Sequence, residues 1–283
     1  MVLTCLFWNF KCDLPDREAM VARLAVEQSV DLLVLAESPT DPDLVLAELR
    51  KFAVEFDFPT NQHERFQIFT KFNGQYLTNL ERHDRLSVHR LCLPSTREVN
   101  FAVIHFYDRR NNHPEAQASF ARDVYLTVHN AEDNAGHTRT VVVGDFNMNP
   151  FEKGMVDAVG GFGAMASREL AIRNSSEGMI GQRRFYNPSW SRLGSAFPPG
   201  TYYWNNVSDP LNIFWHSIDQ VLVRPALLDF FRDEDFRILT SLMSPEGGTI
   251  DLFRSTGKHW KVEVSDHLPI LFKLELPKEE SHV

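Results

Sequence analysis

Apolar runs that are typical of buried strands repeatedly end in a carboxylic acid, an amide or a histidine. The five places are Trp8-Asn9, Ala36-Glu37, Gly144-Asp145-Phe146-Asn147, Ser217-Ile218-Asp219 and, just before the last apolar run, Ser265-Asp266-His267. Proteins with alternating strands and helices usually place their functional sites at such strand ends. Any one of these side chains could instead cap a helix or a turn. Five of them together favour a shared site.

The residue types at these ends suit a hard divalent cation and a phosphate group. Asn9 and Glu37 offer amide and carboxylate oxygens, which Mg²⁺ or Mn²⁺ takes as ligands while keeping several waters. Asp145 and Asn147 are two residues apart, so in an extended segment their side chains point to the same side and could face one phosphate. The alternative is that this segment is only a polar turn ahead of Pro150.

The overall charge limits how such a site could work. The chain has 283 residues, with 29 Lys and Arg against 38 Asp and Glu, which gives a formal net charge of −9. A protein that binds nucleic acid by neutralising many phosphates is usually basic. Phosphate chemistry in this chain would therefore need another source of positive charge, and a bound metal ion at the acidic positions would reverse the local sign.

Composition is ordinary for a globular protein, with 43% hydrophobic and 24% charged residues, which argues against a disordered or fibrous chain. The cysteines Cys5, Cys12 and Cys92 lack the C-x-x-C spacing of zinc or thiol redox sites, so we expect reduced thiols. No apolar run approaches the roughly 20 residues of a membrane span, and no basic leader precedes the first run. We expect a cytoplasmic protein without a membrane span.

Hydrophobic periodicity predicts alternating strands and helices over most of the chain. Strands are expected at Val2–Trp8, Asp31–Ala36, Phe66–Phe72, Arg85–Leu93, Glu98–Phe106, Thr140–Val143, Phe214–Val223 and Leu268–Leu274, and helices at Pro15–Ser29, Asp41–Val54 and Pro114–Glu132. Asp13 is the expected N-cap of the first helix. No linker or low-complexity tract divides the chain, so a single domain over residues 1–283 is expected, with sheets covered by helices in an α/β layered sandwich.

Taken in order, these motifs resemble the endonuclease/exonuclease/phosphatase superfamily, which contains pancreatic-type deoxyribonucleases, apurinic endonucleases, sphingomyelinases and inositol-polyphosphate phosphatases. The motifs are Trp8-Asn9, Leu35-Ala36-Glu37, Ile104-His105-Phe106, Gly144-Asp145-Phe146-Asn147, Ile218-Asp219-Gln220 and Ser265-Asp266-His267-Leu268-Pro269. The resemblance implies a four-layer α/β/β/α sandwich of two mixed, largely antiparallel sheets. It also implies a divalent-metal-dependent phosphoester hydrolase.

The resemblance gives the metal-binding role to Asn9 and Glu37, with Asp266 helping to hold the metal or its waters. A cap on the following helix is the alternative for Glu37. Phe10 stands where the family often has Asp or Gly, and Ala36 replaces a frequent Gln, so the metal stoichiometry does not follow from the motifs.

The resemblance also assigns the catalytic roles. Asp145 would orient or deprotonate the attacking water, with Asn147 beside it. His267 would contact the scissile phosphate, and Asp219 would fix its ring and favour its protonated form. His105 would lie next to the leaving oxygen; a satisfied core histidine is the alternative, and the sequence indicates no carboxylate partner for it.

Substrate choice depends on surrounding loops rather than on the family. A basic cluster comprises Arg82, His83, Arg85, His89 and Arg90, and a second basic and aromatic stretch contains the candidate substrate-binding residues Arg183, Arg184, Tyr202 and Trp204. Basic residues interleaved with aromatic ones are typical of surfaces that follow a phosphate backbone and stack bases. The alternative is that the charges are solvated and the aromatic rings pack a loop onto the core.

The leading hypothesis is therefore a nuclease that uses Mg²⁺ or Mn²⁺ to hydrolyse DNA, or RNA, by direct attack of water. A phosphatase or phosphodiesterase for a small or lipid-linked phosphoester, such as a sugar, inositol or nucleotide phosphate, is the alternative, and the net acidity suits a compact ligand. A non-catalytic binding module is disfavoured because every motif position carries a chemically competent residue.

Overall fold

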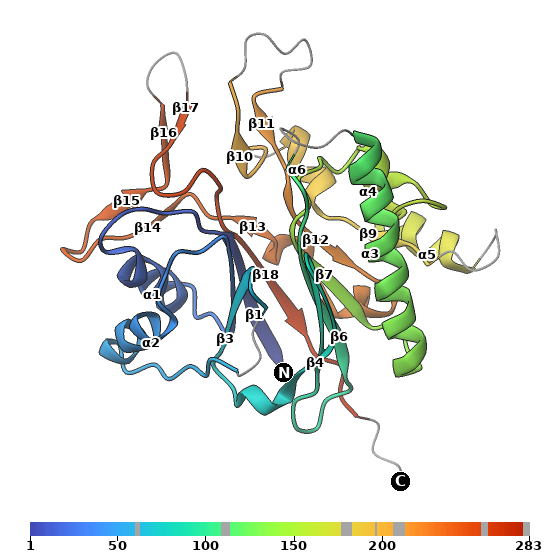
Figure 1. Cartoon of the computed structure of the whole chain (residues 1–283), viewed down its shortest axis with the longest axis horizontal. Helices are drawn as coiled ribbons and strands as arrows, with labels where there is room; N and C mark the ends of the chain where they lie inside the picture. The colour runs from blue at the N-terminus through green and yellow to red at the C-terminus, as the bar shows by residue number, and fades with distance from the viewer. Residues whose placement is uncertain are drawn as a thin grey trace.

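The computed structural model describes residues 1–59, 63–108, 114–176, 183–195, 197–205, 213–255 and 260–279. Two sheets lie face to face between helices, with α1 and α2 outside one sheet and α3 outside the other (Figure 1). This confirms the expected four-layer α/β/β/α sandwich of mixed, largely antiparallel sheets.

The smaller sheet has five strands in the order β13-β18-β1-β2-β3. Their bounds are Arg237–Ile238 for β13, Ile270–Glu275 for β18, Val2–Asn9 for β1, Leu32–Ala36 for β2 and Phe66–Thr70 for β3. Strand β1 is parallel to β2, with Asn9 opposite Ala36, and antiparallel to β18. The parallel pair therefore brings the ends of β1 and β2 to the same edge of the sheet.

The larger sheet has seven strands in the order β4-β5-β6-β7-β12-β9-β8. Their bounds are Leu77–His83 for β4, Leu86–Leu91 for β5, Val99–His105 for β6, Thr140–Asp145 for β7, Asp219–Val223 for β12, Phe185–Tyr186 for β9 and Ala164–Met165 for β8. Strands β6 and β7 are parallel, and β12 runs antiparallel to β7. The end of β6, the end of β7 and the start of β12 thus lie at one edge.

The alternation of side chains along the larger sheet separates two cores. On β6, Phe101 and Val103 belong to the core shared with the smaller sheet, α1 and α2, whereas Ala102 and Ile104 face the core under α3. Val141 and Val143 of β7 follow the same rule. A strand buried on both faces has a continuous apolar sequence, which explains why these runs show no polar alternation.

The helices are α1 (Arg17–Glu27), α2 (Pro42–Lys51), α3 (Pro114–Ala135), α4 (Lys153–Val156), α5 (Arg168–Ser176) and α6 (Ser189–Ser195), with 3₁₀ turns η1 (Gly74–Tyr76), η2 (Pro225–Phe230) and η3 (Asp233–Asp235). Asp41 caps α2 by accepting a 2.9 Å bond from the amide of Asp43, directly before Pro42. None of the helices within the described ranges is long and apolar enough to cross a bilayer.

Short hairpins complete the fold on the side where β6 and β7 end. They are β10 (Tyr202–Tyr203) with β11 (Trp215–His216), β14 (Ser241–Met243) with β15 (Thr249–Asp251), and β16 (Phe253–Ser255) with β17 (Trp260–Val262). In Figure 1 the β10–β11 and β16–β17 hairpins project from the top of the two sheets. They flank the edge at which the candidate site lies.

Several elements differ from the sequence expectation. The expected strand over Phe214–Val223 is two strands, because the chain breaks at Ser217 and Ile218 between β11 and β12. The first helix begins at Arg17 with Asp16 at its N-cap, so the expectation of Asp13 was wrong. Strand β4 was missed: it is largely exposed and polar on both faces, and it therefore lacks an apolar run.

A buried ion pair ties α3 to the far end of β12. Arg224 directly follows β12 and is fully buried; its Nε donates to Glu132 Oε1 at 2.7 Å and a terminal nitrogen donates to Oε2 at 3.1 Å. The guanidinium lies 3.7 Å from the ring centroid of Phe185 and also donates to the carbonyls of Arg183 and Arg184. The charges of Arg224 and Glu132 stabilise each other, because neither side chain is exposed to solvent.

We expect Glu132→Ala to lower the free energy of unfolding by about 3–5 kcal/mol, because it leaves the buried Arg224 charge without its partner. Urea denaturation measures this change. Asp133→Ala is the matched control, since the neighbouring Asp133 is exposed and meets Arg183 only on the outer side of α3. Equal losses in the two variants would contradict a structural role for the buried pair.

Candidate active site

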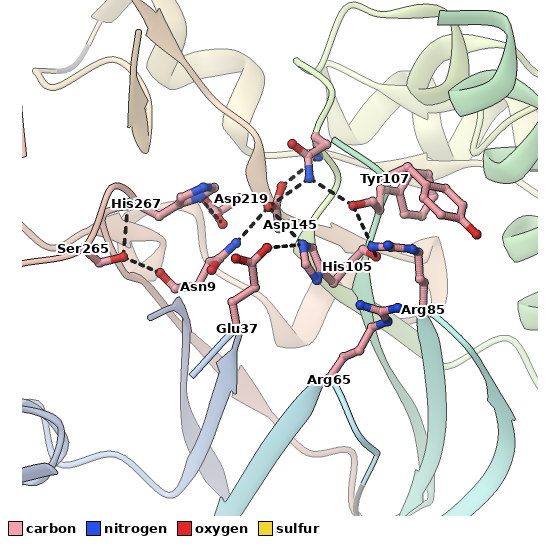
Figure 2. A network of polar contacts seen from close by, with 12 residues as sticks. Asn9, Glu37, Arg65, Arg85, His105, Tyr107, Asp145, Asp219, Ser265 and His267 are labelled. Carbon is pink, nitrogen blue, oxygen red and sulfur yellow. Dashed lines mark hydrogen bonds and ion pairs between the residues drawn. The ribbon is translucent and has the colours of Figure 1, made fainter. Parts of the chain in front are cut away.

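Three functional side chains form a row across adjacent strands of the larger sheet. Asp145 at the end of β7 lies opposite His105 at the end of β6 on one side and Asp219 at the start of β12 on the other. The smaller sheet contributes Asn9 from the end of β1, and His267 precedes β18. Figure 2 shows these side chains converging between the two sheets. The register of two pairs of strands therefore assembles most of the site.

Asp145 is 1% exposed and its carboxylate is held by three donors. Its Oδ1 accepts the amide of Asn147 at 2.8 Å, and its Oδ2 accepts from the Asn9 side chain at 3.0 Å and the Asn147 side chain at 3.1 Å. Asn147 has φ 49°, a left-handed conformation that Asn tolerates better than most residues. Burial, with the neighbouring Asp219 charge, raises the pKa of Asp145 to about 6 against the opposing effect of His267. A carboxylate with this pKa suits a general base near neutral pH.

His267 forms a buried ion pair with Asp219. Its Nδ1 lies 2.9 Å from Asp219 Oδ2, and the two side chains are 8% and 1% exposed. Burial by itself would lower the pKa of His267, but the carboxylates of Asp219, Asp145 and Asp266 together raise it to about 10. The ring is therefore a cation at neutral pH.

His105 pairs with Glu37 across the two sheets. Its Nε2 donates to Glu37 Oε1 at 2.9 Å and lies 3.8 Å from Asp145 Oδ2. The hydrogen bond from His105 lowers the pKa of Glu37 to about 2, although partial burial opposes the shift. Glu37 is thus the carboxylate partner that the sequence did not indicate, because the two residues meet only through the packing of separate sheets.

A family model for the endonuclease/exonuclease/phosphatase family matches residues 6–267, which is most of the chain. The chain belongs to this family. Its members are phosphoester hydrolases that use divalent metals, and this protein is such an enzyme. No curated protein is significantly similar to it in sequence.

Several solved structures share the fold of this protein at low sequence identity. A humanized TDP2 of D. rerio matches with a TM-score of 0.54 and 17% identity over 97% of this chain and 99% of that one. The human Nocturnin catalytic domain, solved with a bound sulfate, matches with a TM-score of 0.56 and 16% identity, over 97% of this chain and 94% of that one. The 3′ phosphatase NExo from Neisseria, bound to a product DNA hairpin, matches with a TM-score of 0.50 and 15% identity, over 96% of this chain and 99% of that one.

The oxygen atoms that converge at this site are suitable ligands for a hard divalent cation. Asn9 Oδ1 is buried and has no hydrogen-bond partner among the described residues, while the same amide donates to Asp145. Glu37 follows the neighbouring strand, and Asp266 is exposed beside His267. Carboxylate oxygens of Asp145 and Asp219 also lie within 4.8 Å of each other, and both could join this donor set, whereas the protonated His267 ring beside them could not. An oxygen that is otherwise unsatisfied is what a bound cation would coordinate.

Two hydrogen bonds that involve no charged group join neighbouring segments of the smaller sheet at the site. Ser265 Oγ donates to the carbonyl of Asn9 at 2.8 Å, and Trp8 Nε1 donates to the carbonyl of His267 at 2.9 Å. Both fix the segment before β18 against the end of β1. Trp8 and Ser265 belong to the sequence motifs, but their positioning roles were not foreseen.

Asn149 and Thr201 are further positioning residues that the sequence reasoning missed. Asn149 is 2% exposed; its Oδ1 accepts the amide of Ser217 at 3.0 Å and its Nδ2 lies 3.1 Å from His216 Nδ1. Thr201 Oγ1 accepts the amide of Asp219 at 3.1 Å. These bonds fix the start of β12 relative to the turn after β7. No sequence signal distinguishes these residues from ordinary turn residues.

Tyr202 and Trp204 of the expected substrate-binding set lie beside the candidate catalytic residue His267. Tyr202 bridges to His267 through the backbone, and their ring centroids are 4.9 Å apart. The rings of Tyr202 and Trp204 are stacked, with centroids 6.3 Å apart and planes 15° apart. Trp204 is 38% exposed. An aromatic strip therefore leads outward from His267.

Arg183 and Arg184 are not brought to this site. Arg183 lies 3.1 Å from Glu132 Oε2 and also pairs with Asp133 on α3. Both arginines are adjacent to Arg224, which follows the end of β12 opposite to Asp219. The basic and aromatic stretch is therefore divided between two ends of the sheet, and Arg183 pairs with acids of α3.

The residues of the other expected basic cluster, at positions 82–90, are also separated from one another in the structure. Arg90 pairs with Glu98 at 2.9 Å, and burial lowers the pKa of His89 to about 4. Arg85 alone of these contacts the site residues: it donates to the carbonyl of His105 at 3.3 Å and lies 4.0 Å over the ring of Tyr107 (Figure 2). It supports the backbone of His105.

We expect His267 of the metal-free protein to titrate near pH 10 and Asp219→Asn to lower that midpoint by more than one unit, because the main carboxylate that raises it is lost. Histidine ring signals in NMR, assigned by their loss in His267→Ala, measure both midpoints. The charged ring contributes stability below its unfolded pKa of roughly 6.5, and this is lost as pH rises through about 10. Asp84→Asn, at the exposed partner of Arg65, is the control; a wild-type midpoint near 6.5 would contradict the ion pair.

Proposed function

We propose that this protein is a metal-dependent phosphodiesterase that hydrolyses nucleic acid, DNA or RNA, by direct attack of an activated water on phosphorus. The observation that carries the choice of substrate is the stacked pair Tyr202 and Trp204, which continues directly from the catalytic His267. Nucleic acid strands offer bases to such a pair.

Asp145 is the group proposed to orient and deprotonate the water. Its pKa of about 6 leaves it ionised at neutral pH and basic enough to accept a proton. Asn9 and Asn147 fix the carboxylate from two directions. A divalent cation held through Asn9 and Glu37, with Asp266 nearby, would neutralise non-bridging oxygens of the phosphate. Mg²⁺ and Mn²⁺ both suit these oxygen ligands.

His267 is proposed to stabilise the negative charge that develops on the phosphate. Its Nδ1 is committed to Asp219, so Nε2 is the ring nitrogen through which it would donate to a phosphate oxygen. The fixed cation needs no reorganisation when the charge develops, which is the basis of electrostatic catalysis. His105, held by Glu37 at 2.9 Å, is proposed to meet the leaving oxygen.

The aromatic strip is proposed to stack bases next to the scissile phosphate. Base stacking on aromatic side chains contributes about 1–3 kcal/mol per base and tolerates different sequences. The net charge of −9 implies weak non-specific affinity for nucleic acid, so binding would depend on these local contacts and on the cation. The same acidity favours a compact phosphoester as the second candidate substrate.

We expect the protein with Mg²⁺ or Mn²⁺ to cleave nucleic acid, and Asp145→Asn or His267→Ala to lower kcat by about 10²–10⁴, the usual contribution of an acid or base group. Cleavage of single-stranded, duplex and abasic DNA and of RNA at low salt measures this, with a chelator as the metal-free control. No cleavage of any of them, together with phosphate release from sugar, inositol or nucleotide phosphates, would replace the proposal by the second candidate.

We expect Trp204→Ala to raise KM for a nucleic acid substrate about tenfold, because one stacking partner is lost. Turnover of a small phosphodiester that carries no base should be unchanged. Phe52→Ala, at an exposed ring on the far side of the smaller sheet, is the matched control and should leave both values unchanged. An unchanged KM in Trp204→Ala would contradict base stacking at this strip.

A further inference from the structure

Side chains outside the proposed catalytic set join the two sheets at the edge formed by β3 and the β4–β5 turn. Arg65 directly precedes β3 of the smaller sheet, and Asp84 lies in the turn between β4 and β5 of the larger sheet. Arg65 Nε donates to the carbonyl of Asp84 at 2.9 Å, and a terminal nitrogen donates to Asp84 Oδ1 at 3.0 Å. One arginine of the smaller sheet is thus bonded to both the backbone and the side chain of the larger sheet.

A second hydrogen bond joins the same two segments. His63 is buried, and its Nε2 donates to the carbonyl of His83. Burial lowers the pKa of His63, so the ring is neutral near pH 7, and its Nδ1 accepts the amide of Arg65 at 3.1 Å. A neutral ring that accepts at Nδ1 carries its proton at Nε2, the nitrogen that faces the carbonyl. We call these bonds between residues 63–65 and 83–85 the edge clasp.

Asp84 lies between two arginines of this edge. Its Oδ1 is 3.0 Å from a terminal nitrogen of Arg65, and its Oδ2 is 3.6 Å from Arg85 Nε. The hydrogen bond from Arg65 lowers the pKa of Asp84, so the carboxylate is ionised at neutral pH. Removal of this carboxylate would leave two like charges facing each other across the two sheets.

On the smaller sheet the edge clasp begins beside Glu37. In the antiparallel pair of β2 and β3, Ala36 lies opposite Phe66. Glu37 follows Ala36 and Arg65 precedes Phe66, so both come from the same end of this pair. Glu37 has φ 48°, a left-handed conformation that persists in a residue other than glycine where its surroundings hold it. The edge clasp therefore acts on the backbone next to Glu37.

On the larger sheet the edge clasp ends beside His105. In the pairing of β5 with β6, Leu86 lies opposite Ile104, and Arg85 continues this register opposite His105. The amide of His105 donates to the carbonyl of Arg85 at 3.1 Å, and Arg85 donates to the carbonyl of His105 at 3.3 Å. The backbone of His105 is therefore bound to the same turn that Arg65 reaches from the other sheet (Figure 2).

We propose that the edge clasp positions the Glu37–His105 pair: it sets the separation of the two sheets at which His105 Nε2 reaches Glu37 Oε1 at 2.9 Å. A hydrogen bond that spans two sheets keeps its geometry only while the sheets keep their distance. Arg65 and His63 are positioning residues, because they act through the backbone beside this pair. The geometric part rests on no proposed function, whereas the expected effect on turnover rests on the proposed role of His105.

Hydrogen exchange of the His105 ring tests the inference, because it needs neither metal nor substrate. The Nε2 proton signal in NMR spectra, assigned by its loss in His105→Ala, reports the bond to Glu37. We expect Arg65→Gln to speed exchange of this proton with water at least tenfold, since the bond opens more often. Arg90→Gln is the matched control: Arg90 also pairs with a carboxylate, Glu98 at 2.9 Å, but at the other end of β5, and exchange should stay within about twofold of wild type.

Asp84→Ala tests the same contact from the larger sheet. Arg65 and Asp84 are both exposed in part, so we expect each variant to keep the circular dichroism spectrum of the wild type. Asp84→Ala should speed exchange of the His105 proton as Arg65→Gln does, because it removes the carboxylate between two like charges. Unchanged exchange in both variants, or an equal increase in Arg90→Gln, would overturn the inference.

Turnover separates positioning from a general loss of stability. With Mg²⁺ and bis(p-nitrophenyl) phosphate, we expect Arg65→Gln to lower kcat about tenfold at unchanged KM, because a small misplacement of a catalytic group slows the reaction. In the His105→Ala background the same substitution should have no further effect on kcat. Losses that multiply in the double variant would overturn the inference. Faster exchange of the His105 proton with an unchanged kcat would support the edge clasp and contradict the proposed role of His105.

Discussion

The register of β6, β7 and β12 is the constraint on which the site depends. It places His105 and Asp219 directly opposite Asp145, on its two sides. A slip of one residue would turn each side chain to the other face of the sheet. The buried alternation of Val141, Val142 and Val143 between two cores prevents such a slip, because both faces of β7 have fixed packing. Core packing therefore sets the geometry of the polar groups.

The second requirement is that two sheets meet with their strand ends aligned. Asn9 and Glu37 come from the smaller sheet, and they reach Asp145 and His105 of the larger one at 3.0 and 2.9 Å. The bond from Ser265 to the backbone of Asn9 fixes the remaining segment, which carries His267. This convergence raises two pKa values for different reasons: burial raises that of Asp145, whereas the surrounding carboxylates raise that of His267. One site thereby holds a carboxylate with a raised pKa and a histidine cation within 4.8 Å of each other.

The sequence predicted the elements that carry continuous apolar runs and the strand ends that carry polar groups. It could not predict β4, because an exposed strand such as Leu77–His83 has no apolar run and depends on its pairing with β5. It also could not predict the contact of Glu37 with His105, since only the packing of the two sheets joins them. Arg183 was expected near substrate from its aromatic neighbours, but residues close in sequence diverge here: Tyr202 reaches His267, while Arg183 pairs with acids of α3.

For phosphate binding, the distribution of charge over the protein matters more than the net charge. Acidic side chains gather at one end of the strands, where Asp145, Asp219 and Asp266 all act on His267. At the other end one hollow is lined by Arg97, Arg139 and Lys278 together with apolar residues, and the hollow beside it is lined by both acids and cations. Parallel strands explain how such a difference arises, because β6 and β7 send all their first residues to one edge and all their last residues to the other. The net charge of −9 is therefore unevenly distributed, and a cation bound at the edge that carries the candidate site would reverse the local sign there.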